Sequence, residues 1–374
     1  MEVIGTIAAF IGILVVLVLV HELGHFLVAK RAGITVEEFG IGFPPRIGSV
    51  TWRGTRYSLN WIPLGGFVRM LGEDGNVEIR RLREQGLTEA EIDRAMEGAF
   101  NRRPIWVRVT VLLAGVAMNF LLAAALFAVA FSMPRLVAHG PLTVTAVQAD
   151  SPADGRLREK DVIVGADGQT FELSRELTEY IAGHAGETVA LNVERGGELI
   201  EVLVIPRTPE ELSAGTGPVG FSYEPARLDE DPPLADGPVD AVWRGTTAAA
   251  TLAVQIPGGL ADAVGGLLGL NPDAAGDARG PIGIAQETGR ILEAPLVSQL
   301  LFVGLLSVNL AVLNVLPFPP LDGGRIAVVL REATRRRKLP AEREALIYLA
   351  GFAVLIALVI LISIQDIQRL ITGG

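Results

Sequence analysis

Two histidines and a glutamate at close spacing are the residues of this chain best suited to chemistry. The stretch is His21-Glu22-Leu23-Gly24-His25, and it directly follows a run without charge from Val3 to Val20. On a helix, side chains four residues apart share a face, so the two imidazoles point the same way. This spacing lets both rings bind one Zn²⁺, with Glu22 beside them as the general base for the attacking water.

The scarcity of histidine argues against a chance match. The chain contains only four His, and two of them fall at this spacing. A charged group inside an apolar membrane helix costs about 2.5–3.5 kcal/mol, so such a cluster indicates function. Gly24, between the two imidazoles, leaves room for another backbone or a substrate to approach. The motif therefore predicts a zinc centre at the end of a hydrophobic helix.

The third zinc ligand is less evident than the first two. A catalytic zinc ion normally takes three protein ligands and leaves one position for water. The remaining histidines, His139 and His184, lie in or beside a segment expected on the other side of the membrane, and the chain has no Cys. A carboxylate is therefore expected. Asp322 is favoured because it follows another apolar run, and Glu37 and Glu38 are its competitors.

Composition indicates a membrane protein with one soluble domain. Half of the 374 residues are hydrophobic, and the mean hydropathy is positive. A net charge of −10 argues against a general nucleic-acid binder, so we expect no nucleic-acid partner. Four segments approach the roughly 20 residues that a bilayer core requires. They are residues 4–29, 105–131, 296–316 and 345–364.

Basic residues near the ends of these segments predict the orientation. They cluster after the first segment, at the start of the second, and between the third and the fourth, and such residues favour the cytoplasmic side. The intervening segment 135–293 is rich in Asp and Glu and is expected outside. The histidine pair then lies nearer the cytoplasmic face. The basic residues are Lys30, Arg31, Arg102, Arg103, Arg108, Arg331, Arg335, Arg336, Arg337 and Lys338.

A β-hairpin is expected over residues 36–70. Two runs typical of strands, 47–52 and 55–61, are separated by Arg53-Gly54. An ordinary cytoplasmic hairpin and a hairpin that dips toward the metal fit this pattern equally well. In the second case its open edge could pair with an extended substrate. Farther along, residues 88–96 are typical of a short charged helix capped by Thr88.

Residues 141–207 alternate as strands and turns and predict a compact soluble domain. The Ser151-Pro152-Ala153 turn, the Asp161-Val162-Ile163 strand and the hairpin around Arg195-Gly196-Gly197 resemble a bacterial PDZ domain, a binder of peptide ends. Residues 208–237 are rich in Pro, Glu, Asp and Gly and are interpreted as a linker. In residues 239–270, Pro257-Gly258-Gly259 is expected to interrupt the helix, which favours helices lying at the membrane interface over a fifth span.

The third apolar segment carries polar groups at its end. Asn309 and Asn314 precede Pro317-Phe318-Pro319-Pro320-Leu321-Asp322-Gly323-Gly324. The prolines break the helix, and broken helix at membrane depth is tolerated only where it is buried in protein or lines a cavity. Asp322 is then a carboxylate held at a helix break. The alternative is that Asp322 only caps the helix that restarts after it.

Three features in this order resemble the site-2 protease family of zinc intramembrane metalloproteases. They are the His21–His25 motif, the Asn314…Leu321-Asp322-Gly323 stretch, and a PDZ-like domain between the second and third spans. Residues 61–68 also look like the family's membrane re-entrant hairpin. The resemblance implies His21, His25 and Asp322 as zinc ligands and Glu22 as the catalytic base. It further implies that Asn314 and Asn309 help to hold the substrate.

The resemblance also implies a fold class, a reaction and a location. The fold is a polytopic α-helical membrane protein with about four transmembrane helices, a membrane-associated β-hairpin and an inserted extracytoplasmic α+β PDZ-like domain. The reaction is zinc-dependent cleavage of membrane-spanning segments of single-pass proteins already cut by another protease. The location is the bilayer of the bacterial cytoplasmic membrane. The rivals are a membrane scaffold or chaperone that no longer cuts, and a small transporter with an ion site at Asp322.

The expected boundaries follow from these segments. The transmembrane helices are 1–30, 105–134, 296–330 with the broken segment at Asp322, and 345–366. The segments between them are the loop 31–104 with its hairpin, the PDZ-like domain 138–208, the linker and interfacial helices 209–295, and the basic loop 331–344.

Overall fold

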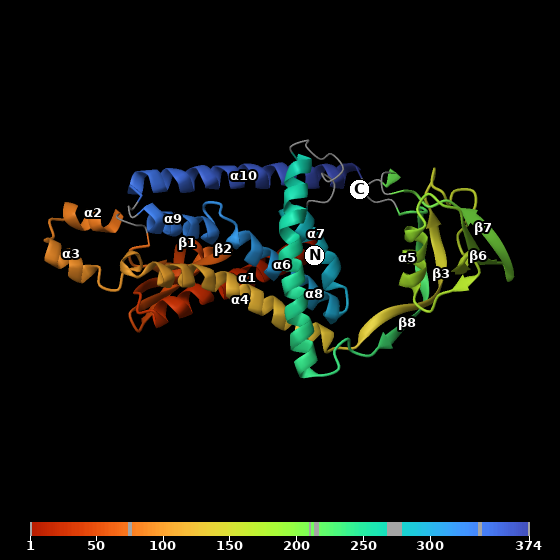
Figure 1. Ribbon diagram of the computed structural model, residues 1–374, viewed down its shortest axis with the longest axis horizontal. Coiled ribbons are helices and arrows are strands. Elements are labelled where there is room, and N and C mark those ends of the chain that lie inside the picture. The colour runs from red at the N-terminus through yellow and green to blue at the C-terminus, as the bar shows by residue number, and fades with distance from the viewer. Residues whose placement is uncertain are drawn as a thin grey trace. The chain divides into compact units, whose positions relative to one another are not determined.

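The computed structural model describes residues 2–73, 77–208, 211–212, 217–267, 279–335 and 339–372. Two compact units make up the chain (Figure 1). The helical unit comprises Met1–Ser132 and Ala235–Ile371, and the β-rich unit is Met133–Leu234. The β-rich unit is therefore inserted between two parts of the helical unit along the chain.

Four helices in the described part of the chain are long and apolar enough to cross a membrane, as expected. Their candidate spans are Val3–Arg31, Ile105–Phe131, Leu296–Val315 and Glu342–Gln368. The first and fourth spans are only 6% buried within the unit, which suits helices whose outer faces contact lipid, where every backbone polar group must be satisfied internally. The fold class of a polytopic membrane protein is confirmed. The helices that carry the spans are α1 (Glu2–Arg31), α4 (Ile105–Phe131), α8 (Leu296–Val315) and α10 (Ala341–Thr372).

Shorter helices connect and flank the spans. At the start of α3, the backbone N–H of Thr88 donates to the Glu91 carboxylate at 2.8 Å, so this helix begins where the sequence indicated. The shorter elements are α2 (Val77–Glu84), α3 (Glu89–Ala95), η1 (Phe100–Arg102), α7 (Pro281–Leu292) and α9 (Asp322–Arg335).

One interruption predicted from the sequence is wrong. Pro257 was expected to break residues 239–270 into separate helices, but α6 runs through it as one helix, Pro238–Leu267. An internal proline removes only one helical hydrogen bond, and packing can offset that loss. Here α6 packs against α4 and α8, where Gly245 lets its backbone approach Ala124 closely. Packing against α4 and α8 therefore outweighs the tendency of Pro257 to end the helix.

The hairpin forms a small sheet beside α1. It consists of β1 (Val36–Trp52) and β2 (Thr55–Met70), and register shifts divide each long strand into two halves. Residues 36–41 pair with residues 66–70, and part of the same stretch also lies beside residues 56–59. The second half of β1 pairs with the first half of β2 through Trp52 and Thr55 at the turn. Residues 38–41 of β1 therefore lie between residues 56–59 and residues 66–69 of β2. Within the described part of the chain, residues 66–70 pair with β1 along one side only.

The β-rich unit is an antiparallel sheet with one helix. The strand order is β7-β6-β4-β3-β8, with β5 paired to β4, and α5 packs on the sheet. Its core contains the fully buried Leu142, Ile163, Leu177 and Leu191. The elements are β3 (Arg135–Val147), β4 (Val162–Ala166), β5 (Gln169–Thr170), α5 (Ser174–Gly183), β6 (Val189–Arg195), β7 (Glu198–Val204) and β8 (Phe221–Asp231).

The interpretation of residues 208–237 as a linker is wrong for strand β8. This strand pairs with β3 from Val147–Phe221 to Arg135–Asp231. Its composition resembles a linker because it contains Pro225 and several acidic residues. Proline lacks an N–H donor and is tolerated on an edge strand, which is the place of β8 in the sheet. The β-rich unit consequently extends past the boundary at residue 208.

Candidate metal centre

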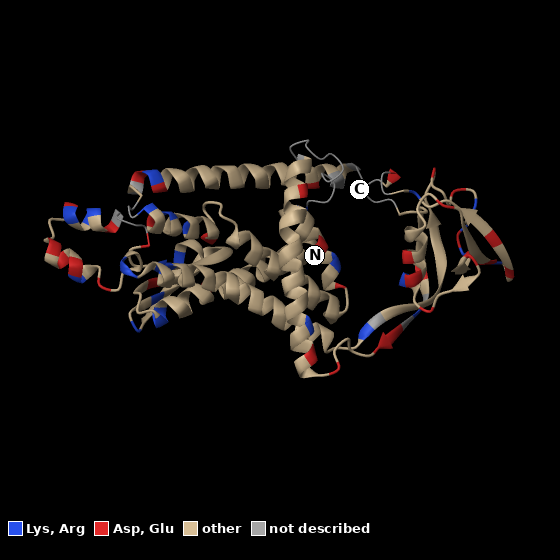
Figure 2. Ribbon diagram, viewed as in Figure 1, with Lys and Arg blue, Asp and Glu red and all other residues tan. Residues whose placement is uncertain are grey.

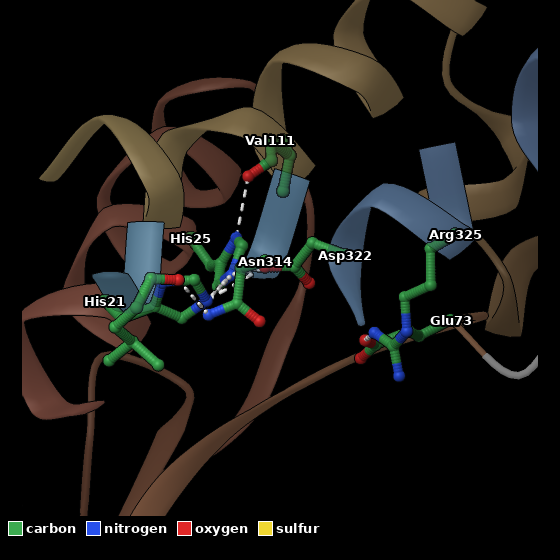
Figure 3. A network of polar contacts seen from close by, with 8 residues as sticks. His21, His25, Glu73, Val111, Asn314, Asp322 and Arg325 are labelled. Carbon is green, nitrogen blue, oxygen red and sulfur yellow. Dashed lines mark hydrogen bonds and ion pairs between the residues drawn. The ribbon is translucent and has the colours of Figure 1, made fainter. Parts of the chain in front are cut away.

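Two helices far apart in the chain bring three ligand-type side chains together (Figure 3). His21 and His25 come from α1, and Asp322 is the first residue of α9. The Asp322 Oδ2 atom lies 2.9 Å from His21 Nε2 and 3.1 Å from His25 Nε2. The two Nε2 atoms are 3.1 Å apart. Three electron-pair donors thus converge on one point, and this is the group of residues in the described chain that could hold a metal ion.

The tautomer of His25 follows from its other ring nitrogen. His25 Nδ1 lies 2.8 Å from the carbonyl oxygen of Val111 on α4 (Figure 3). A carbonyl only accepts, so Nδ1 carries the proton and Nε2 presents its lone pair to the centre. This arrangement is typical of metal-binding histidine, whose second nitrogen is fixed by an outer partner. His21 Nδ1, in contrast, is buried and has no hydrogen-bond partner among the residues that the structure describes.

Two glycines let α1 and α4 approach each other at the centre. A Cβ atom at Gly24 would collide with the carbonyl group of Ala114, which confirms that this glycine makes room for another backbone. A Cβ atom at Gly115 would collide with the rings of His25 and His21. The imidazoles therefore lie directly against the backbone of α4, and their positions are set by packing as well as by spacing.

A sharp break between α8 and α9 places Asp322. Helix α8 ends at Val315, and α9 begins at Asp322 after a short proline-containing connection. A Cβ atom at Gly323 would collide with the carbonyl groups of Val315 and Leu316, so the chain folds back on the end of α8. The tight return carries the first residue of α9 into the bundle, against the histidine pair.

A cavity of about 320 Å³ opens onto the three ligands. Glu22 and Asn314 line it together with the ligands themselves. The Asn314 side chain donates one N–H to the carbonyl of Leu310 at 3.0 Å, which leaves its second N–H for another acceptor. The base and one of the two substrate-holding residues expected from the sequence are therefore at the cavity wall.

The hairpin borders the same cavity. Phe67, Val68 and Met70 of β2 are among the lining residues. A Cβ atom built on Gly66 would lie 3.8 Å from Glu22 Cγ and 3.3 Å from Leu19 Cδ2, so this end of β2 lies along α1 at the level of the glutamate. Of the two arrangements left open by the sequence, the structure has the hairpin next to the metal centre.

An ion pair at the cavity wall was not predicted. Glu73 follows β2, Arg325 lies one helical turn after Asp322, and their side chains form an ion pair (Figure 3). The other carboxylate oxygen of Glu73 accepts the backbone N–H of Met70 at 3.1 Å. Glu73 thus connects the end of the hairpin to the helix that begins with a metal ligand. Arg325 follows Asp322 by three residues, which puts both side chains on the same face of α9. This spacing was the signal in the sequence that could have indicated a charged neighbour of the ligand.

Other residues considered from the sequence lie elsewhere. Asn309 does not line this cavity, and its side chain donates to the carbonyl of Leu305 at 3.1 Å. Glu38 binds Arg46 at 2.9 Å instead of approaching the histidines. Burial alone would raise the pKa of Glu38, but hydrogen bonds from Ser58 and Arg46 outweigh it and lower that pKa. Glu38 is therefore an anion that binds within the hairpin.

The two remaining histidines belong to the β-rich unit. His139 lies 3.0 Å from an oxygen of Asp231, and His184 Nδ1 lies 2.8 Å from the carbonyl oxygen of Tyr180. Both rings thus have partners within the β-rich unit and do not approach the metal centre. This agrees with the expectation that the third metal ligand is a carboxylate.

The donor set fits zinc. Two imidazole nitrogens and one carboxylate oxygen are a common set for catalytic Zn²⁺, which keeps a fourth position open. In the neutral ring, Nε2 of His25 presents its lone pair to the centre, and the adjoining cavity provides the open side. Fold and site together define a membrane-embedded, metal-dependent hydrolase.

Comparison with known proteins assigns this chain to one family. The model of peptidase family M50 matches residues 9–358, and the chain belongs to this family. The chain is 28% identical to the zinc metalloprotease RasP of Geobacillus kaustophilus, over 98% of this chain and 99% of that one. It is 27% identical to the regulator of sigma-W protease RasP of Bacillus subtilis, with the same coverage.

The solved structures include a PDZ domain of an SdrC-like protein from Listeria innocua. It is 28% identical to this chain and covers 24% of this chain and 99% of its own length, with a TM-score of 0.21. The family match confirms the resemblance to site-2 proteases, and the chain is a zinc metalloprotease of the membrane.

Proposed function

We propose that this protein is an intramembrane endopeptidase that cleaves membrane-spanning segments of single-pass proteins. The observation that supports this most is the location of the cavity. It is bordered by three apolar spans, by the edge of a hairpin and by the three convergent donors. A peptide bond that enters it is surrounded by membrane helices while facing the groups that hydrolysis needs.

The chemistry is divided among few residues. His21, His25 and Asp322 hold zinc, which when bound acidifies water and polarises a carbonyl. Glu22 accepts the proton of the attacking water and passes it to the leaving amine. The second N–H of Asn314 donates to the substrate backbone or to the oxygen that gains negative charge. Asn309 is a weaker candidate for the same task because it lies outside the cavity lining.

The hairpin edge is suited to hold an unwound substrate. A helical substrate hides its carbonyl groups in its own hydrogen bonds and must be extended before it is cut. Residues 66–70 pair with β1 on one side, and no further strand in the described part of the chain pairs with their other side. An extended segment can add to this edge by backbone pairing. Phe67 and Val68 then present it to the cavity.

The proposed orientation follows the distribution of charge. The basic residues after α1, before α4, at the end of α9 and at the start of α10 (Figure 2) lie on the cytoplasmic side. The acidic β-rich unit lies outside. The metal centre is then nearer the cytoplasmic face. The β-rich unit acts as a filter against substrates that still carry bulky outer domains, so an earlier cut by another protease is required.

Since the chain contains no Cys, single introduced cysteines test this orientation. In intact cells, a membrane-impermeant maleimide should label Glu198→Cys in the β-rich unit and spare Glu84→Cys on α2. The reverse labelling pattern would invert the topology.

The substrate class rests on a relative as well as on the site. The Bacillus subtilis relative is named as a regulator of sigma-W protease, which supports single-pass regulatory proteins as substrates here. Membrane-bound anti-sigma factors and signal-peptide remnants both have the required form. A comparison of membrane fragments in cells with and without the active protease distinguishes them.

The test of the proposed reaction is Glu22→Gln. This variant should fold and bind zinc but leave a membrane-spanning reporter uncut, because the amide cannot accept the proton. The matched control is Glu84→Gln on α2, whose side chain is 71% exposed and which should retain full cleavage. Full cleavage by Glu22→Gln would remove Glu22 from the mechanism.

A further inference from the structure

A second cavity, separate from the metal site, lies between α9, α10 and the connection that precedes α9. Its volume is about 520 Å³. Most of its wall is apolar. The apolar lining includes Pro317, Pro319, Val328, Leu339, Leu346 and Ile347.

Two arginines complete the wall of this cavity. Arg331 of α9 and Arg343 of α10 both line it, and both are exposed. Among the described residues, neither guanidinium group has an ion-pair partner. Other arginines of the same helical unit differ, since Arg108 pairs with Glu332 at 3.0 Å and Arg325 pairs with Glu73. The cavity therefore carries two positive charges that no carboxylate of the described chain neutralises.

The charged and apolar parts of the cavity are separated along the helices. On α9, Arg331 lies one turn beyond Ala327, toward the end of that helix. On α10, Arg343 lies one turn before Ile347, toward the start of the membrane span. The end of α9 and the start of α10 lie together at the end of the helical unit where Lys and Arg gather (Figures 1 and 2). One end of the cavity is thus cationic, and the other end is apolar at membrane depth.

We propose that this cavity binds one anionic phospholipid. The two guanidinium groups bind the phosphate by charge-assisted hydrogen bonds, and an acyl chain lies along the apolar walls of α9 and α10. Basic pockets between transmembrane helices bind anionic lipid headgroups in this way. A free phosphate ion matches only the cationic end of the cavity, whereas a phospholipid matches both ends.

The lipid would adjoin the connection that places a metal ligand. Pro317, Pro319 and Gly324 line the cavity, and Asp322 lies among them in the sequence. Gly324 packs against the backbone of Phe318 and Pro319, and Gly351 of α10 also packs against Pro319. A bound lipid fills the remaining space beside this connection and supports it. Anionic lipid is therefore expected to raise the activity of the protease without touching the zinc.

Lipid binding is tested on the purified full chain by native mass spectrometry. The probes are phosphatidylglycerol and phosphatidylcholine of equal chain length. We expect one tightly retained phosphatidylglycerol and no equivalent retention of phosphatidylcholine. The variant Arg331→Gln/Arg343→Gln should weaken phosphatidylglycerol binding by about 30-fold, as expected for two basic residues near an anionic headgroup.

The control removes the same charge elsewhere. Arg81→Gln/Arg94→Gln, on α2 and α3, lowers the net charge equally and should leave lipid binding unchanged. Equal loss of lipid in the control would indicate a general charge effect and overturn the proposal. Equal retention of both lipids, or displacement of phosphatidylglycerol by millimolar inorganic phosphate, would overturn it as well.

A second variant covers the case in which the double substitution fails to fold. Ile347→Trp fills the apolar end and keeps both arginines, and it should also lose phosphatidylglycerol. Retention of the lipid by this variant would contradict the proposed acyl-chain position. In proteoliposomes, phosphatidylglycerol should stimulate reporter cleavage by the wild-type chain and not by Arg331→Gln/Arg343→Gln, at equal zinc content. Lipid binding is measured without cleavage, so failure of the proposed protease function would leave this test intact.

Discussion

Two aspartates, one in each unit, are held in opposite ways. In the β-rich unit, Asp161 is 1% exposed and accepts hydrogen bonds from Arg195 at 2.6 and 2.8 Å and from the backbone N–H of Arg158 at 2.8 Å. In the helical unit, Asp322 faces His21 and His25. The nearby cation, Arg325, is bound to Glu73 instead.

The difference separates a structural charge from a functional one. Asp161 is neutralised within the fold, and its partners are complete without any ligand. The Asp322 carboxylate and the two Nε2 atoms lie within 3.1 Å of one another, and this convergence of ligand atoms suits a cation at the centre. A carboxylate that meets two imidazoles in place of an arginine is thus the sign of a binding site in this protein. Five predictions test this contrast, from the largest expected effect to the smallest.

The largest effect is expected for Asp322→Ala. Removal of a direct ligand should reduce zinc content and lower cleavage by more than about 10²-fold, since loss of an outer-shell partner already costs 10–100-fold. The β-rich unit should be unaffected. Zinc is measured by atomic absorption and cleavage with a membrane-spanning reporter. Full zinc occupancy in this variant would mean that another group completes the site.

The converse is expected for Asp161→Asn. Breaking a buried ion pair by removing one partner costs about 3 kcal/mol, so the β-rich unit should unfold more readily. Zinc content should not change. Protease susceptibility of the β-rich unit in the full chain measures the effect, and Arg175→Gln, at a side chain 71% exposed, is the control. Loss of zinc in Asp161→Asn would show that the two charges are not independent.

Gly115→Ala should weaken zinc binding through packing alone. The new methyl group would collide with the ring of His25 and displace it from α4. We expect zinc affinity to fall by about 10–100-fold, as for loss of an outer-shell contact. Gly12→Ala in α1 is the control, because no atom of the described chain outside its own helical turns lies within 4 Å of the added methyl group. Similar zinc affinities of the two variants would show that packing against α4 does not position the imidazoles for zinc.

Glu73→Gln should have a moderate effect on the centre. Without Glu73, Arg325 can pair with Asp322 one turn away on the same helix face and draw it from the metal. Zinc affinity should decrease by about 10-fold, at the low end for an outer-shell change. The double variant Glu73→Gln/Arg325→Gln removes the competing cation and should recover most of that loss. No recovery would assign the effect to the bond between Glu73 and Met70.

The smallest effect concerns pH. Burial alone would raise the pKa of Asp161, but the hydrogen bonds from Arg195 and Arg158 outweigh it and lower that pKa. The folded-state pKa is below the unfolded value of about 3.9, so the stabilisation is present above that pH and is lost as the pH falls through the folded value. Below about pH 4, the stability difference between the wild type and Asp161→Asn should shrink. A difference independent of pH would exclude ionisation of Asp161 as its source.

Features with a local cause could be predicted from the sequence. The four spans depend on runs of apolar residues, and the start of α3 depends on Thr88 and the glutamate three residues later. Strand β8 and the continuity of α6 could not be predicted in this way. Their sequences contain local breakers, Pro225 and Pro257, and these are tolerated because of an edge position and of packing against other helices.

The sequence by itself determined which residues could bind zinc. Helical spacing sets His21 and His25 on one face, and the lack of Cys together with the placement of the other histidines left a carboxylate as third ligand. Only the tertiary structure decided that Asp322, about three hundred residues away, reaches the same point. It also decided the tautomer of His25, through the Val111 carbonyl. Periodicity is a property of neighbouring residues, whereas convergence of distant groups depends on how helices pack, which no short stretch of sequence encodes.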